Sequence, residues 1–270
     1  MCVNRIINKD CREALRRIKT GTVDLVVTSP PYDDLRDYSD GNSGWDFKAF
    51  RQVARSLVRV LKPGGVIVWV VGDQVVSGAK TMSSYRQALY FTELGLNMYD
   101  VIIYEKAGSG PPHRNRYFNT YEYMFVLSKG KPKTVNLLQD KPNKYGGLTT
   151  YGIVSRREKD GTLTEKGKKT INEMGVRTNI WRYANGKGFA TRDDVAYLHP
   201  AIFPEKLALD HILSWSNEGD LVLDPFAGSG TTAKMSILSG RRWIAIEKSA
   251  EYCGLIRARL QGLVQLNLEF

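Results

Sequence analysis

The sequence has no long hydrophobic run. Its longest purely apolar stretch covers only residues 66–71, whereas a helix needs roughly 20 such residues to cross a bilayer. The opening segment, MCVNRIINKD, has no apolar core of the kind that a secretory signal carries. These absences argue against a membrane-spanning or secreted protein, and we therefore expect a cytoplasmic one.

Cysteine and histidine are scarce as well. The three cysteines, Cys2, Cys11 and Cys253, lie far apart and form no CxxC pair, and the three histidines are scattered. A disulfide framework or a zinc cluster needs several such residues at short, regular spacings. The pattern argues against both, so we expect a reducing compartment and no bound metal.

Positive charge, in contrast, is abundant: the net charge is +11 at pH 7. Residues 129–179 hold 12 Lys and Arg against 5 Asp and Glu, so this stretch alone carries +7 of the total. A concentrated basic segment attracts a polyanion such as nucleic acid. A solvated basic face would have the same composition, and charge alone does not separate the two interpretations.

Short apolar runs alternate with amphipathic segments over most of the chain. This alternation predicts βα units, a mainly parallel sheet and therefore the α/β class. The predicted strands are residues 5–8, 23–27, 66–71, 99–104, 122–127, 221–223 and 243–246. The predicted helices are residues 45–61, 205–215, 231–238 and 250–260.

The middle of the chain differs from both flanks. Residues 130–178 are rich in Lys, Gly, Asn and Thr, have few apolar residues and show no sustained period. A structureless segment of this length is unusual inside a compact domain, so we interpret it as an inserted module. The predicted organisation is an N-terminal half of the main domain (residues 1–129), the basic insert (130–178) and a C-terminal half (179–270).

A glycine-rich turn follows a predicted strand near the C-terminus, in LVLDPFAGSGTTAKM. Glycines let a ligand approach the backbone, and the following helix offers free N–H groups at its N-terminus. An acid at the end of the next strand can accept hydrogen bonds from ribose hydroxyls. The turn favours a nucleotide-type cofactor, although such turns also occur without a ligand and a dinucleotide fits the local pattern. The candidate residues are Asp224, Phe226, Gly228, Gly230, Thr231 and Glu247.

A second candidate site follows the predicted strand at residues 23–27, in TSPPY. In open α/β sheets, ligands bind at the carboxyl ends of the strands. Pro30 and Pro31 hold the preceding residues extended, which directs the Pro30 carbonyl as an acceptor. The Ser29 hydroxyl can also accept, and Tyr32 offers a flat aromatic face. Two acceptors beside an aromatic platform suit an exocyclic amino group on a planar heterocycle.

TSPPY and DPFAGSGTT together resemble the motifs of S-adenosylmethionine-dependent DNA amino-methyltransferases, which modify cytosine N4 or adenine N6. The order of the Pro-Pro motif, a variable region and the cofactor loop is similar to the beta class of that family. Further stretches also look like the family: KDCREAL, LKPGG, NTYEYMFVLSKG and HPAIFPEKL. The resemblance implies a Rossmann-like, seven-stranded, mostly parallel sheet in circularly permuted order, with residues 130–178 as the target-recognition region.

The resemblance also implies roles for particular residues. Ser29, Pro30, Pro31 and Tyr32 would hold a base rotated out of the duplex, because an amino group is out of reach inside the helix. Asp10 matches the acid that contacts the cofactor adenine, and Cys11 is assigned to the same site. The turn residues would hold the rest of S-adenosylmethionine, with Glu247 at the ribose. The candidate contacts to double-stranded DNA are Arg114, Arg116, Lys141, Lys144, Arg156 and Arg157.

The choice of base stays open in the sequence. Family members with Ser at position 29 are more often cytosine-N4 enzymes and those with Asp mostly adenine-N6 enzymes, so we favour cytosine N4 and keep adenine N6 as the alternative. An RNA methyltransferase and a DNA-binding protein without catalysis are the competing functions. The resemblance further implies a prokaryotic or phage-encoded enzyme that works at the nucleoid, with a homodimer and a cognate restriction endonuclease as candidate partners.

Overall fold

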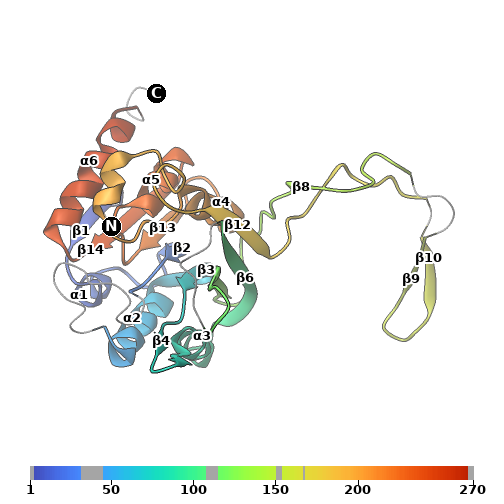
Figure 1. The fold of residues 1–270 in the computed structure, drawn as a ribbon, viewed down its shortest axis with the longest axis horizontal. Helices are drawn as coiled ribbons and strands as arrows, with labels where there is room; N and C mark the ends of the chain where they lie inside the picture. The colour runs from blue at the N-terminus through green and yellow to red at the C-terminus, as the bar shows by residue number, and fades with distance from the viewer. Residues whose placement is uncertain (1–2, 32–44, 108–114, 150–153, 167, 267–270) are drawn as a thin grey trace. The chain divides into compact units, whose positions relative to one another are not determined.

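The computed structural model describes residues 3–31, 45–107, 115–149, 154–166 and 168–266. Within them, one large sheet has eight strands (Figure 1). Their spatial order is β1 (Arg5–Asn8), β14 (Arg242–Glu247), β13 (Leu221–Asp224), β2 (Val23–Thr28), β3 (Leu61–Val71), β7 (Tyr121–Ser128), β6 (Asn97–Ala107) and β12 (Ile180–Ala184). Neighbouring strands pair in parallel except where β7 meets β3 and β6. The predicted α/β class is confirmed, with one strand more than the seven expected because β12 pairs with β6 at the sheet edge.

The central strands form where apolar residues are nearly continuous. All six side chains of β2 are buried, and so are those of residues 66–71 in β3. Continuous burial is typical of parallel sheets, which are covered on both faces by helices. Every predicted strand corresponds to a strand of the structure, and β12 is the strand of this sheet that the patterns did not predict as such.

In the described part of the chain, six α-helices cover the sheet. α1 (Cys11–Arg16), α2 (Phe47–Val60) and α3 (Ser83–Glu93) lie along one face, and α4 (Glu205–Trp215), α5 (Thr231–Leu238) and α6 (Ala250–Leu266) along the other (Figure 1). The helix α2 begins where the Asp46 carboxylate accepts a hydrogen bond from the Ala49 N–H at 2.7 Å, which satisfies one unpaired backbone donor. The four predicted helices are confirmed; α1 and α3 were not predicted.

The main core lies between the sheet and the first helix layer. Phe50, Trp69 and Phe91 are fully buried and meet edge to face or tilted at 5.2–5.8 Å between ring centroids. The indole N–H of Trp69 donates to the Gln87 side-chain oxygen at 2.7 Å, so its buried polar atom is satisfied. This packing holds α2 and α3 against β3, next to the loop in which Ser29 and its neighbouring prolines lie.

The chain divides into two compact units. The first comprises Met1–Asn136 with Asn179–Phe270, and the second is Leu137–Thr178. Residues before position 137 belong to the first unit because Lys133 N–H donates to the Gly64 carbonyl at 2.9 Å and Asn136 N–H to the Ser214 carbonyl at 2.8 Å. The second unit therefore begins later than residue 130, where the basic insert was predicted to start.

The second unit contains two short antiparallel pairs. β8 (Lys141–Pro142) pairs with β11 (Met174–Gly175), and β9 (Val154–Arg157) pairs with β10 (Leu163–Lys166). An ion pair between Arg177 and Asp140 and a backbone hydrogen bond from Arg177 N–H to the Leu138 carbonyl at 2.9 Å tie its two ends together. Hydrogen bonds and local pairing thus organise this unit, which has few buried apolar side chains among its described residues.

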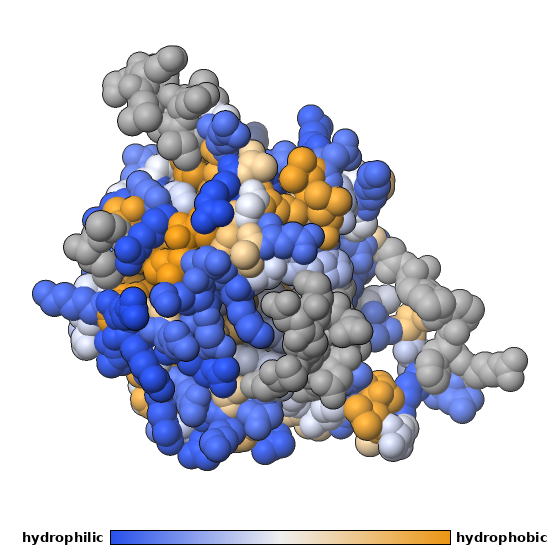
Figure 2. Space-filling view, turned by 90° about the vertical axis from the view of Figure 1, so that its left-hand side faces the viewer, coloured by the Kyte–Doolittle hydropathy of each residue, from blue (hydrophilic) through white to orange (hydrophobic). Residues whose placement is uncertain are grey.

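The face seen in Figure 2 is mostly hydrophilic, with hydrophobic surface confined to separate patches. None of the helices in the described ranges has both the length and the hydrophobicity of a membrane-spanning segment. In the same part of the chain, no group of three or more His, Cys, Asp or Glu side chains is arranged to hold a metal ion.

Candidate functional site

The Ser-Pro-Pro turn leaves the carboxyl end of β2 as predicted. Pro30 is buried, and Ser29 and Pro31 are half-buried. The buried Thr28 donates its hydroxyl proton to the Asp224 carboxylate at 2.7 Å. This bond joins the turn to the end of β13, the neighbouring strand. Tyr32 lies outside the described residues.

The glycine turn after β13 needs glycine for two reasons. Gly228 and Gly230 have φ angles of +51° and +79°, in the left-handed region that disfavours other residues. A Cβ atom at Gly228 would also come within 2.9 Å of the His199 ring, and one at Gly230 within 2.8 Å of the Ile256 side chain. The turn is therefore packed closely between the imidazole of His199 and the helix α6.

Asp224 is the buried acid at the start of this turn. Its Oδ1 atom accepts hydrogen bonds from the Thr28 hydroxyl and, at 3.0 Å, from the Phe226 N–H. Burial raises the pKa of Asp224, and these hydrogen bonds offset part of that effect. The carboxylate thus holds the turn from inside, and its hydrogen bond to Thr28 links it to the residue that precedes Ser29 in the chain.

Glu247 stands at the end of β14 and also contacts the turn. Its Oε2 atom accepts from the Gly228 N–H at 2.8 Å, and its Oε1 atom accepts from the Ser249 N–H at 2.9 Å. Burial raises the pKa of Glu247, while these backbone hydrogen bonds lower it. Each carboxylate oxygen has a second lone pair, so the group can accept further hydrogen bonds from a bound hydroxyl.

Asp10 caps the N-terminus of α1. Its carboxylate accepts from the Arg12 backbone N–H at 2.8 Å and from two guanidinium nitrogens of the same residue at 2.8–2.9 Å. The hydrogen bonds from Arg12 lower the pKa of Asp10, so the group is an anion at neutral pH. Beside it, burial raises the pKa of Cys11 to about 12, which keeps this thiol protonated and unreactive.

One cavity of about 580 Å³ brings these groups together. Such a volume is in the range of pockets for small molecules and cofactors. Its lining includes every described clamp and cofactor candidate except Gly230, namely Ser29, Pro30, Pro31, Asp10, Cys11, Asp224, Phe226, Gly228, Thr231 and Glu247. The lining fits S-adenosylmethionine, because it combines carboxylates that can accept hydrogen bonds from hydroxyl and amino groups, an aromatic ring and a closely packed glycine turn.

The cavity also contains residues that the sequence patterns did not assign to it. Trp45 contacts the Phe226 ring edge to face at 5.0 Å between centroids. Lys106 and Glu122, at the ends of the neighbouring strands β6 and β7, form an ion pair at 2.5 Å. His199 lines the cavity above the glycine turn. Glu122 and His199 lie in stretches that look like the family, NTYEYMFVLSKG and HPAIFPEKL, but neither residue was assigned a role there.

The described candidate DNA contacts do not line this cavity. Arg114 lies outside the described residues. Arg116 is exposed in the first unit and donates to the Gly78 carbonyl. The other four are exposed in the second unit: Lys141, Lys144, Arg156 and Arg157.

Comparisons with known proteins agree with this geometry. The family profile N6_N4_Mtase, described as DNA methylase, matches residues 23–258. The orphan methyltransferase M.BamHII of Bacillus amyloliquefaciens is 53% identical over 247 residues, which cover 91% of each chain. The type II methyltransferase M.BglII of Bacillus subtilis is 30% identical over 99% of this chain and 72% of its own.

Solved structures show the same fold. A DNA modification methylase of Thermus thermophilus, solved in complex with S-adenosyl-L-methionine, has a TM-score of 0.63 and 27% identity and covers 96% of this chain and 95% of its own. PvuII DNA methyltransferase (cytosine-N4-specific) has a TM-score of 0.68 over 98% of this chain and 92% of its own. At 19% identity, the second likeness concerns the fold alone.

Proposed function

The chain belongs to the N6_N4_Mtase family of DNA methylases and is an S-adenosylmethionine-dependent DNA amino-methyltransferase, and from this premise we propose that it methylates the exocyclic N4 of cytosine in a base rotated out of the duplex. The observation that carries the site assignment is the Thr28–Asp224 hydrogen bond at 2.7 Å. It joins the residue before Ser29 to the strand end before the glycine turn. The base clamp and the cofactor turn are therefore neighbours on one cavity wall.

The clamp residues act as hydrogen-bond acceptors in this proposal. The Ser29 hydroxyl and the Pro30 carbonyl accept from the two N–H groups of the target amine, which favours a localised lone pair on nitrogen. They also stabilise the positive charge that develops on this nitrogen, because fixed acceptors need no reorganisation during the reaction. S-adenosylmethionine supplies the electrophilic methyl group. No strong base is needed before the methyl transfer, since the proton can leave afterwards.

Four groups would hold the cofactor. Glu247 accepts from the ribose hydroxyls and Asp10 from the adenine amino group, both at the carboxyl ends of neighbouring strands. Asp224 and the ring of Phe226 line the same cavity as Ser29. The Glu247 carboxylate is already oriented by the N–H groups of Gly228 and Ser249, so little side-chain entropy is lost on binding.

Substitution of Ser29 tests the clamp. We expect Ser29→Ala to lower kcat by about a hundredfold, the scale of one lost preorganised hydrogen bond in a transition state. The dissociation constant of S-adenosylmethionine, measured by calorimetry, should stay within about twofold because Ser29 contacts the base. Weaker cofactor binding at unchanged kcat would contradict this role.

The base identity rests on Ser29, since the resemblance associates Ser at this position more often with cytosine N4. Mass spectrometry of nucleosides from the DNA of an expressing host tests it. N4-methylcytosine supports the proposal. N6-methyladenine would show that the target base is adenine and not cytosine, with the same clamp chemistry. Methylated RNA with unmodified DNA would overturn the proposal itself.

The second unit is proposed to recognise the target sequence and grip the duplex. Its four candidate cations are exposed, as phosphate contacts require. Each phosphate contact adds about 0.9 to the slope of log affinity against log salt concentration. Replacing all four by Gln should reduce that slope, and replacing four exposed cations of the first unit, Arg5, Arg16, Arg17 and Lys19, by Gln is the matched control. An equal decrease of the slope in both variants would contradict the assignment of the four cations of the second unit to the duplex.

Two further partners are proposed on the family resemblance. The monomer has a mass of 30.4 kDa, so a homodimer would give twice this mass in light scattering. A cognate restriction endonuclease would be detected as cleavage of unmodified host DNA by a neighbouring gene product.

A further inference from the structure

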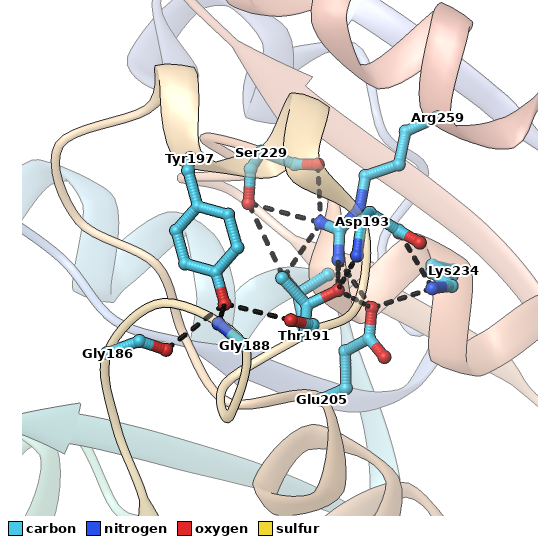
Figure 3. Close-up of polar contacts among 10 residues, drawn as sticks. Gly186, Gly188, Thr191, Asp193, Tyr197, Glu205, Ser229, Lys234 and Arg259 are labelled. Atoms are coloured by element: carbon cyan, nitrogen blue, oxygen red, sulfur yellow. Dashed lines mark hydrogen bonds and ion pairs between the residues drawn. The ribbon is translucent and has the colours of Figure 1, made fainter.

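The connection between β12 and α4 builds another wall of the cavity. Asn185, Gly186 and Lys187 line the cavity, as does Tyr197 in the short 3₁₀ helix at Asp194–Leu198. The Tyr197 hydroxyl accepts from the Gly188 N–H at 2.7 Å and lies 2.8 Å from the Thr191 carbonyl oxygen (Figure 3). We call residues 185–205 the wall segment.

Arg259 of α6 connects the wall segment to the glycine turn. Its side chain is only 1% exposed. One guanidinium nitrogen, Nη1, donates to the Ser229 carbonyl at 2.8 Å and to the Thr231 hydroxyl at 3.1 Å. The other two nitrogens reach the Asp193 carboxylate at 2.7 Å and the Glu205 carboxylate at 2.6 Å (Figure 3). A single planar group thus spans two segments of the cavity lining.

Lys234 of α5 completes the charge balance of this cluster. Its ammonium group donates to Asp193 and to Glu205, at 2.7 Å each. Burial alone would raise the pKa of Asp193, but hydrogen bonds from Lys234 and Arg259 lower it overall. Two cations therefore face two carboxylates, as buried charges require. Of these two cationic side chains, it is Arg259 that donates hydrogen bonds to the glycine turn.

We propose that Arg259 is a positioning residue that holds the glycine turn at Ser229–Thr231 in register with the wall segment, so that the cofactor and base parts of the cavity are kept in one arrangement. The proposal rests on the assignment of this turn to the cofactor. A guanidinium suits the task because its donors form a rigid fork, whereas an ammonium group is a compact point charge on a flexible stem. Lysine at this position would keep the ion pairs and lose the simultaneous bonds to the turn.

The test compares three variants. Arg259→Lys should raise the dissociation constant of S-adenosylmethionine about tenfold or more, the scale of lost hydrogen bonds to a charged group, with a small decrease in Tm. Lys234→Gln, the matched control, should decrease Tm more and leave cofactor affinity within about twofold, because the Lys234 ammonium group bonds the two carboxylates and not the turn. Arg259→Gln should decrease both the affinity for S-adenosylmethionine and the Tm.

The outcomes separate positioning from simple stabilisation. If affinity follows Tm across the three variants, Arg259 only stabilises the fold and the proposal is wrong. If Arg259→Gln does not fold, the other two variants still test the proposal, because Arg259→Lys should lose mainly cofactor affinity and Lys234→Gln mainly Tm. At saturating cofactor, Arg259→Lys should recover more of its kcat than of its kcat/KM for the cofactor.

A fourth variant distinguishes failure of the inference from failure of the site assignment. Asp224→Ala removes a proposed cofactor contact and should weaken binding whether or not Arg259 positions the turn. If Asp224→Ala weakens binding and Arg259→Lys does not, the positioning role alone is overturned. If neither variant alters affinity, the cofactor assignment of the turn has failed and the inference with it.

Discussion

Gly228→Ala should destabilise the protein by about 2–5 kcal/mol, and the structure divides that cost into two parts. The first is the left-handed backbone: at φ +51°, a residue with a Cβ costs about 1–2 kcal/mol. The second is steric, because the new Cβ would lie 2.9 Å from two atoms of the His199 ring. Overpacking of this kind costs about 1–3 kcal/mol. The His199 ring is held in place, since it packs on Tyr252 at 4.5 Å between ring centroids and its Nδ1 atom lies 2.9 Å from the Ala201 carbonyl oxygen and 3.1 Å from the Ala201 nitrogen.

Urea unfolding of four variants separates the two parts, because the midpoint and slope give the free energy of unfolding. Gly21 has a similar φ, +63°, and open space around its Cβ position, so Gly21→Ala measures the backbone part alone. The steric part should largely vanish when Gly228→Ala is combined with His199→Ala, judged against His199→Ala alone. If Gly228→Ala costs no more than Gly21→Ala, the close packing of His199 on the turn is refuted.

Two further predictions concern buried carboxylates. Because burial raises the pKa of Asp224, its ionisation opposes folding, and wild-type stability should be lost as pH rises from about 4, the unfolded pKa. Asp224→Asn should therefore gain in Tm relative to wild type as pH rises above about 4, while binding S-adenosylmethionine more weakly, and a gain that shrinks with rising pH would contradict the sign. Lys62→Met should lower the free energy of unfolding, measured in urea, by about 1–3 kcal/mol, because the Lys62 ammonium group lies 2.6 Å from the buried Asp24 carboxylate. If the double variant with Asp24→Asn loses as much free energy as the two single variants together, the pair does not interact.

The sequence patterns predicted best the elements whose burial is continuous or periodic. The strands β2 and β3 are runs of apolar residues, and α4 and α5 were predicted with the bounds that the structure has. The helix α1 has only six residues, too few for a recognisable period. The strand β12 is shorter still, with five residues, and its exposed Ile180 is apolar, so its alternating burial does not show as a polar–apolar alternation in the sequence.

The candidate site was predicted from two local motifs, and the structure brings their described candidate residues, except Gly230, to one cavity. The supporting contacts were not predictable in this way. Arg259 and Asp193 are 66 positions apart, and the close approach of His199 to Gly228 depends on how two loops pack. A single sequence contains the residues of such contacts but no local pattern that pairs them.

The position of β1 at the sheet edge has a consequence for how the chain acquires its structure during synthesis. Among the described strands, β1 pairs only with β14, in a register that sets Arg5 opposite Ile244. The ribosome therefore makes β1 long before its partner, which lies near the other end of the sequence. Pairings between such distant segments form slowly because a long loop must close first. A strand made early is thus among the last to be incorporated, and until then its unpaired edge is a site where a nascent chain can associate wrongly or be bound by a chaperone.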